Sequence, residues 1–169
     1  KLYDFPFATY AKGGLMQASN GKLYGMTKTG GANGYGTIFS YDYSTSTFTT
    51  VYSLAALTGW DPHGNLMQAS NGKLYGMTRY GGAPNKGVIF SFDYSTSTYT
   101  DLFDFTGADN GERPTGSLIQ ASNGKLYGGT TIGGTSGNGA IFSFNYTTLA
   151  FTKIMDCSSV NGNTIYGTP

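Results

Sequence analysis

The chain has 169 residues, of which 27 are glycine, 14 are tyrosine and 11 are phenylalanine, and charged residues make up only 11% of it. This mixture is too aromatic for a disordered protein and too rich in glycine for long helices, so it indicates a single all-β domain. The formal net charge is +1 and the ten basic residues are scattered singly, which argues against a nucleic-acid partner, and no apolar run is long enough for membrane insertion.

A thirteen-residue segment occurs three times along the chain. LMQASNGKLYGMT at 15–27 returns unchanged at 66–78, and LIQASNGKLYGGT at 118–130 differs from it at two positions. The copies are 51 and 52 residues apart, and a period near 50 indicates a repeat architecture. The β-forming runs of the first copy lie, in chain order, at 15–19, 22–27, 36–43 and 47–54. Each repeat is therefore predicted to be a four-stranded antiparallel meander.

The connections between these runs carry different turn signals. Asn20-Gly21, which returns in both later copies, predicts a type I′ hairpin because both central residues of that turn need a positive φ. A glycine pair after the second run predicts a loop with an unusual backbone path. In the third connection, Asp42 and Asp93 are predicted to cap a Ser/Thr turn.

Bulky side chains on both faces of the predicted strands point to a particular β fold. In the third run Phe39 and Tyr41 point to one face while Ile38 points to the other. A sheet covered on both faces by sister sheets is what a β-propeller blade requires. We therefore predict a single β-propeller domain. Its full blades are expected at 15–65, 66–117 and 118–157, and its partial blades at 1–14 and 158–169.

The third copy also resembles a known bacterial repeat. Residues 105–144 read FTGADNGERPTGSLIQASNGKLYGGTTIGGTSGNGAIFSF, which is similar to the unit of GloVer-type tandem-repeat proteins, with its L-Y-G-x-T, G-G and I-F series. The resemblance extends over all three copies. It implies a β-propeller-like repeat protein that is exported and held at the cell surface by a C-terminal anchor, although this sequence contains no such anchor. The resemblance carries over no defined biochemical activity.

Both ends of the sequence match parts of the repeat. KLYDF at 1–5 matches the fourth runs at 50–54 and 101–105, and NGNTIYGTP at 161–169 matches a hairpin with its second run. Three full blades cannot close a ring, because propellers use about four to eight. We therefore expect either a homo-oligomer completed through partial blades or a longer repeat chain.

Few residues are candidates for catalysis or metal binding. His63 and Cys157 are the single histidine and the single cysteine, so a catalytic triad or a His/Cys metal cluster is not expected. Cys157 is predicted to be a buried thiol. Asp109, Asn110 and Glu112 offer oxygen ligands of the kind calcium prefers, although the first copy lacks most of them.

The candidate ligand-binding residues form two groups. Lys28, Trp60, Arg79 and Tyr80 lie where the copies differ, next to loops that commonly carry recognition. The second group is repeated once per blade and could form one small pocket in each, or else fill the space between blades. Its members are Gln17, Gln68, Gln120, Tyr24, Tyr75 and Tyr127.

These observations favour a non-enzymatic β-propeller protein, outside the cell or on its surface, that acts in adhesion or binds a ligand such as a glycan. The alternative is a structural subunit of a homo-oligomeric ring or an extracellular filament assembled through incomplete blades. A polysaccharide-active enzyme ranks last, and no cofactor is expected. The expected partners are copies of the chain itself, or the rest of a longer repeat chain, and an extracellular glycan or surface protein.

Overall fold

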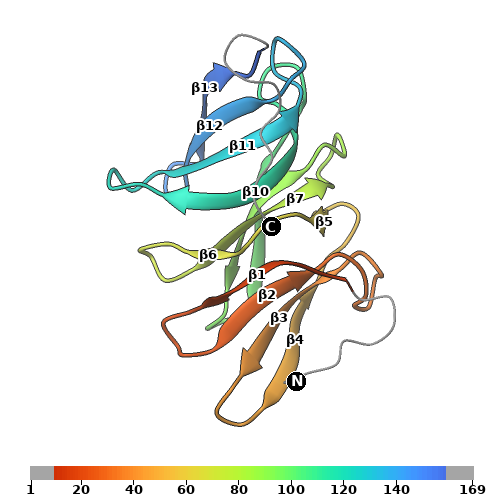
Figure 1. The fold of residues 1–169 in the computed structure, drawn as a ribbon, viewed down its shortest axis with the longest axis vertical. Helices are drawn as coiled ribbons and strands as arrows, with labels where there is room; N and C mark the ends of the chain where they lie inside the picture. The colour runs from red at the N-terminus through yellow and green to blue at the C-terminus, as the bar shows by residue number, and fades with distance from the viewer. Residues whose placement is uncertain (1–9, 159–169) are drawn as a thin grey trace.

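The computed structural model describes residues 10–158, and it contains three antiparallel sheets that follow one another along the long axis of the molecule (Figure 1). All regular secondary structure in this range is β. No helix in the described range is long and apolar enough to cross a membrane. The all-β prediction is confirmed.

The sheets are built from consecutive strands, one sheet for each copy of the repeat. Sheet 1 has the order β1-β2-β3-β4, and sheet 3 has the order β10-β11-β12-β13. Sheet 2 has the order β5-β7-β8-β9, with β6 also paired to β7. The strands of sheet 1 are β1 (Ala11–Gln17), β2 (Leu23–Thr27), β3 (Thr37–Asp42) and β4 (Thr47–Ser53). Those of sheet 2 are β5 (Trp60–Pro62), β6 (Met67–Gln68), β7 (Leu74–Tyr80), β8 (Val88–Asp93) and β9 (Thr98–Asp104). Those of sheet 3 are β10 (Glu112–Gln120), β11 (Leu126–Ile132), β12 (Ala140–Asn145) and β13 (Ala150–Asp156).

The first strand of each sheet begins earlier than the sequence pattern indicates. β1 starts at Ala11 rather than Leu15, and its register with β2 shifts between Lys12 and Met16. Near these irregularities, the first segments of neighbouring sheets pack closely. A Cβ on Gly64 would lie 1.9 Å from the carbonyl oxygen of Gly116. Glycine at this position therefore lets two backbones touch, and the strand is interrupted or bulged there.

The hairpin between the first two strands is not the predicted type I′ turn. Asn20 is absent from the residues with positive φ, whereas Gly21 has a φ of 82°. The amide of Ala18 donates to the carbonyl of Lys22, and the amide of Gly21 donates to the carbonyl of Ala18. This is a three-residue loop closed by a glycine bulge, and the same hydrogen bonds recur in both later copies.

The core lies between the sheets, where side chains from facing sheets interdigitate. We call the contact of sheets 1 and 2 seam 1, and that of sheets 2 and 3 seam 2. In seam 1, Met26 and Ile38 of sheet 1 pack with Phe90 and Phe92 of sheet 2. In seam 2, Ile89 of sheet 2 packs with residues of sheet 3. Sheet 2 is thus covered on both faces, as predicted for a blade.

Candidate ligand-binding site

Charged and aromatic side chains gather at the end of the sheets opposite the Asn-Gly hairpins. β7 runs from its hairpin to Tyr80, and Trp60 of β5 pairs with Tyr80 across the sheet. Arg113 lies at the start of β10, also at this end. We call the group that meets here the basic-aromatic cluster. It consists of Lys28, Trp60, Asp61, His63, Arg79, Tyr80 and Arg113.

An aromatic stack forms the centre of the cluster. The Trp60 and Tyr80 rings stack with centroids 4.4 Å apart and planes 21° apart. The indole nitrogen of Trp60 donates to Asn85 Oδ1 at 3.2 Å, and the Tyr35 ring lies 5.8 Å from Trp60. Trp60 and Tyr80 remain partly exposed and Tyr35 is exposed, so ring surface is available to a ligand.

Two guanidinium groups lie beside this stack. Arg79 Cζ is 5.7 Å and Arg113 Cζ is 5.4 Å from the centre of the Tyr80 ring, which is cation–π distance. Arg79 Nε is buried and has no hydrogen-bond partner among the described residues. A buried donor without a partner is costly, and a ligand acceptor at this point would satisfy it.

A buried carboxylate organises the cations on the other side of the cluster. Asp61 is only 2% exposed and has a φ of 55°, a conformation that Asp tolerates better than most residues. Its Oδ1 lies 3.3 Å from Lys28 Nζ and 3.4 Å from His63 Nε2. Burial lowers the pKa of His63, and the nearby cations lower it further, while Asp61 opposes them. The imidazole is therefore neutral at pH 7.

The structure brings together four of the ten predicted ligand-binding residues. Lys28, Trp60, Arg79 and Tyr80 all belong to the basic-aromatic cluster. Sequence reasoning did not include Asp61, His63 or Arg113 in a site. Asp61 and Arg113 occupy equivalent positions in consecutive repeats, with opposite charge, and that difference between otherwise similar copies was the available signal.

The repeated glutamines are placed at the hairpin end, not in the cluster. Gln68 joins sheets 1 and 2: its Oε1 accepts from the amide of Ser19 at 2.8 Å, and its Nε2 donates to Tyr94 at 3.1 Å. Gln120 makes the corresponding bonds in seam 2. Gln17 donates to Tyr43 at 3.1 Å within sheet 1.

The repeated tyrosines have protein partners at the same end. Tyr24 is 3% exposed, accepts from the Asn20 amide at 3.0 Å and has its ring 5.6 Å from that of Tyr94. Tyr75 is also buried and accepts from its own hairpin asparagine. Tyr127 accepts from Asn123 in the same way.

The weak calcium candidate does not converge on one point. Asn110 Oδ1 accepts from the amide of Thr106 at 2.8 Å, and Glu112 forms an ion pair with Lys86 at 2.9 Å. Asp109 is exposed. In residues 10–158, moreover, no group of three or more His, Cys, Asp or Glu side chains is arranged to hold a metal ion.

Two other predictions about single residues are confirmed. Asp42 Oδ1 accepts from the amide and hydroxyl of Ser44 at 3.0 and 2.6 Å, and Asp93 does the same with Ser95. These hydrogen bonds lower the pKa of both carboxyls. Cys157 is buried, and burial raises the pKa of its thiol.

Comparison with known proteins identifies the repeat. The model of the Gloeobacter/Verrucomicrobia repeat matches residues 2–168. The chain belongs to this family. No curated protein matched its sequence. Membership of the Gloeobacter/Verrucomicrobia repeat family agrees with the resemblance seen in the GxLYGxT and G-G series.

Solved structures with a similar fold are larger β-propeller-like proteins. The extracellular domain of BT4673 from B. thetaiotaomicron aligns with a TM-score of 0.59 and 15% identity, over 94% of this chain and 18% of that one. The extracellular domain of BT3049 from B. thetaiotaomicron gives 0.55 and 17%, over 88% and 16%. TolB from Acinetobacter baumannii gives 0.51 and 16%, over 82% and 30%. The chain spans less than a third of the length of each of these structures.

Proposed function

We propose that this chain is a non-enzymatic extracellular binding protein whose basic-aromatic cluster recognises acidic carbohydrate chains. The extracellular location is supported by two of the similar structures, which are extracellular domains, and by a composition low in charge and rich in Ser, Thr, Tyr and Asn. Recognition of a surface polysaccharide would make the protein an adhesion module.

The observation that carries the proposal is the Trp60–Tyr80 stack with Arg79 and Arg113 beside it. Exposed aromatic faces pack against the C–H surfaces of sugar rings, and a guanidinium binds a carboxylate or sulfate through two parallel hydrogen bonds. The unpartnered Arg79 Nε is a donor for such a group. Lys28 is paired with Asp61 and Arg113 lies 3.9 Å from Glu112, whereas Arg79 has no ion pair among the described residues, and this cation favours an anionic ligand.

The binding role, in place of catalysis, is supported by the positions of the candidate carboxylates. Asp42 and Asp93 hold equivalent turns and accept from serines in identical ways. A glycosidase needs two carboxyls in different environments flanking one bond. Two matching turn caps on separate sheets do not provide such a pair.

Titration of the intact chain against a carbohydrate array, followed by calorimetry with the acidic oligosaccharides retained, tests the proposal. Trp60→Ala and Arg113→Ala should each weaken binding about tenfold or more, because each removes a central contact. Lys73→Ala is the matched charge control, since Lys73 pairs with Asp93 at 3.6 Å at the hairpin end, and it should bind like the native chain. Binding that is equally strong in Trp60→Ala and Arg113→Ala would contradict the proposal.

A further inference from the structure

The two seams are held by the same set of polar contacts. In seam 1 the hydroxyl of Ser19 lies 2.9 Å from that of Tyr94, and Gln68 Nε2 donates to both at 3.0 and 3.1 Å. In seam 2 the hydroxyl of Ser70 lies 3.1 Å from that of Tyr146, with Gln120 bonded to both at 3.0 and 3.1 Å. A complete seam therefore needs a serine from one sheet and a Gln–Tyr pair from the next.

The apolar part of each seam is equally regular. Leu66 is 3% exposed, and Leu118 is 2% exposed. Each lies over a glycine of its own sheet, with Leu66 Cδ2 3.0 Å from the Cβ position of Gly76. The preceding sheet covers this leucine and buries it. A leucine in this position thus marks the face that receives a preceding sheet.

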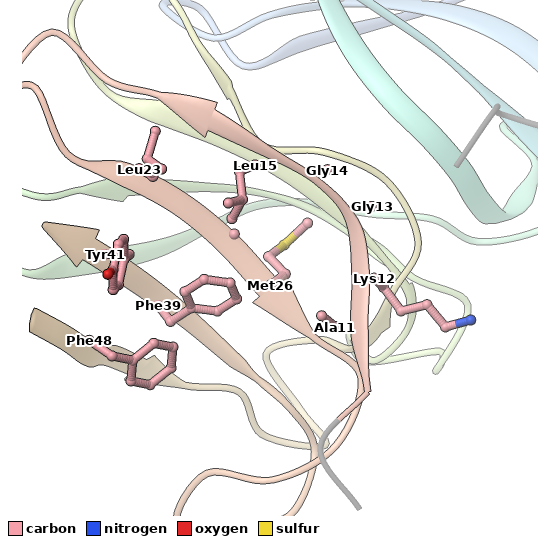
Figure 2. A pocket seen from close by; sticks show the side chains of 11 residues that line it. Ala11, Lys12, Gly13, Gly14, Leu15, Leu23, Met26, Phe39, Tyr41 and Phe48 are labelled. Atoms are coloured by element: carbon pink, nitrogen blue, oxygen red, sulfur yellow. The ribbon is translucent and has the colours of Figure 1, made fainter. Parts of the chain in front are cut away.

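Sheet 1 presents that receiving face to solvent. Leu15, which corresponds to Leu66, is 56% exposed, although it lies over Gly25 in the same way. Gln17 already donates to Tyr43 at 3.1 Å, but no described residue donates to its Oε1, and Tyr43 is 55% exposed. The face also carries a hollow of about 290 Å³ next to Leu15 (Figure 2). This face therefore has the Gln–Tyr pair and the leucine of a seam, but no serine from a preceding sheet.

Sheet 3 presents the opposite half. Ser122 stands in the same QASNG hairpin as Ser19 and Ser70, yet it has no hydrogen-bond partner among the described residues. Ile154 and Met155 correspond to Leu102 and Phe103, which pack into seam 2. Here they are 53% and 38% exposed. Sheets 1 and 3 therefore lie at opposite ends of the stack and carry complementary open faces (Figure 1).

We propose that sheet 3 of one copy of the chain docks on sheet 1 of a second copy and forms a third seam. In it, Ser122 occupies the place beside Gln17 and Tyr43 that Ser19 occupies beside Gln68 and Tyr94. The occupant is a second copy because its QASNG hairpin is identical to the one that fills both existing seams. Reciprocal docking of two copies brings together the six sheets of their described residues, a number within the four to eight blades of closed propellers.

Analytical ultracentrifugation over a concentration series tests the association directly. The native chain should sediment as a multiple of its 17.9 kDa mass. Leu15→Asp should return it to the mass of one chain, because a charge would be buried in the new seam. Leu57→Asp is the matched control on an exposed loop residue and should associate normally. Ser122→Ala should weaken association about three- to tenfold.

Cross-linking provides a second readout that does not depend on a loss of binding. In a Cys157→Ala background, Gln17→Cys with Ser122→Cys should be joined between chains by a short bis-maleimide and double the mass on a denaturing gel. Ser19→Cys with Gln68→Cys repeats this pair within seam 1 and should be joined inside one chain. Two results would overturn the proposal: a native chain that stays at the mass of one chain at every concentration, or association that persists unchanged in Leu15→Asp.

Discussion

The rings of Tyr52 and Tyr99 lie parallel across seam 1, with centroids 4.4 Å apart and planes 3° apart. Phe103 and Phe151, which occupy the same places one repeat later, stack across seam 2 at 4.3 Å and 3°. Tyr99 has an additional contact, because its hydroxyl donates to the carbonyl oxygen of Thr58 at 2.5 Å. One side chain thus ties sheet 2 both to sheet 1 and to the loop that connects them.

Substitution of Tyr99 should separate these two contributions. Tyr99→Ala is expected to lower the free energy of unfolding by about 3 kcal/mol, because it removes a large ring from a packed stack. Tyr99→Phe keeps the ring and loses only the hydrogen bond to Thr58, which should cost about 1 kcal/mol. Urea denaturation measures both, with the exposed Tyr10→Ala as control. Equal losses in Tyr99→Phe and Tyr99→Ala would show that packing is not the main contribution.

A glycine pair tests the close approach of the first strands. Gly64→Ala should destabilise the fold by about 3 kcal/mol, because its Cβ would overlap the carbonyl of Gly116 and push two strands apart. At Gly14 the nearest atom to a new Cβ is 3.5 Å away, an ordinary contact. Gly14→Ala should therefore change stability by less than about 1 kcal/mol. Thermal unfolding of the two variants makes the comparison, and similar melting temperatures would contradict it.

The hairpins show how far a local pattern can be interpreted. Asn20-Gly21 correctly marks the position of a hairpin, but the turn has three loop residues rather than two. The dipeptide is compatible with both forms. The contact of the Ser19 amide with Gln68 Oε1 does not decide between them, because the third copy forms the same turn although Ser122 has no hydrogen-bond partner among the described residues. The two forms differ in the φ of the asparagine, which the dipeptide alone leaves open.

The basic-aromatic cluster shows the same limit for a site. Trp60 and Tyr80 could be named as binding candidates because they vary within a constant frame. Asp61 and Arg113 were marked only by their opposite charge at equivalent positions, because the contacts that place them in the cluster are made with residues distant in the sequence. Single-residue chemistry that is purely local, such as the Asp42 cap, was predictable from the sequence alone.

His63 offers a direct measurement of the electrostatics in the cluster. As the single histidine, it should give one imidazole signal in an NMR titration, with a pKa below the usual 6.5. Asp61→Asn should lower this pKa further, because the carboxylate is the one group that favours the charged imidazole. Lys12→Ala should raise it, because Lys12 repels that charge. A rise of the His63 pKa in Asp61→Asn, or a fall in Lys12→Ala, would mean that the groups around His63 are arranged differently.

Asp101 should make stability depend on pH. Burial, followed by the neighbouring Asp104, raises the pKa of Asp101 to about 7. The folded state therefore holds this proton more tightly than the unfolded state. The stabilisation that Asp101 contributes is fully present below about pH 4, and it is lost as the pH rises through about 7. Because Asp101 is exposed to solvent in the structure, screening reduces the expected loss to about 1 kcal/mol or less.

Asp101→Asn checks this linkage. The variant cannot titrate at this position, so its free energy of unfolding should be flatter between pH 4 and 7, and at pH 8 it should equal or exceed that of the native chain. Asp109→Asn, at an exposed acid remote from this pair, should keep the native slope. If the free energy of unfolding of Asp101→Asn depended on pH as steeply as that of the native chain, another group would be responsible for the pH dependence.

Each repeat carries the Gln–Tyr pair of one seam on one face and the serine of the next seam on the other, as Gln68 and Ser70 do in sheet 2. Any repeat can therefore pack against any other repeat on either side. An inserted duplicate of residues 66–117 would meet its complement on either side without any compensating substitution. The length of such an array can be altered in whole units by gene duplication or by engineering, while a cut at any other spacing would leave mismatched faces.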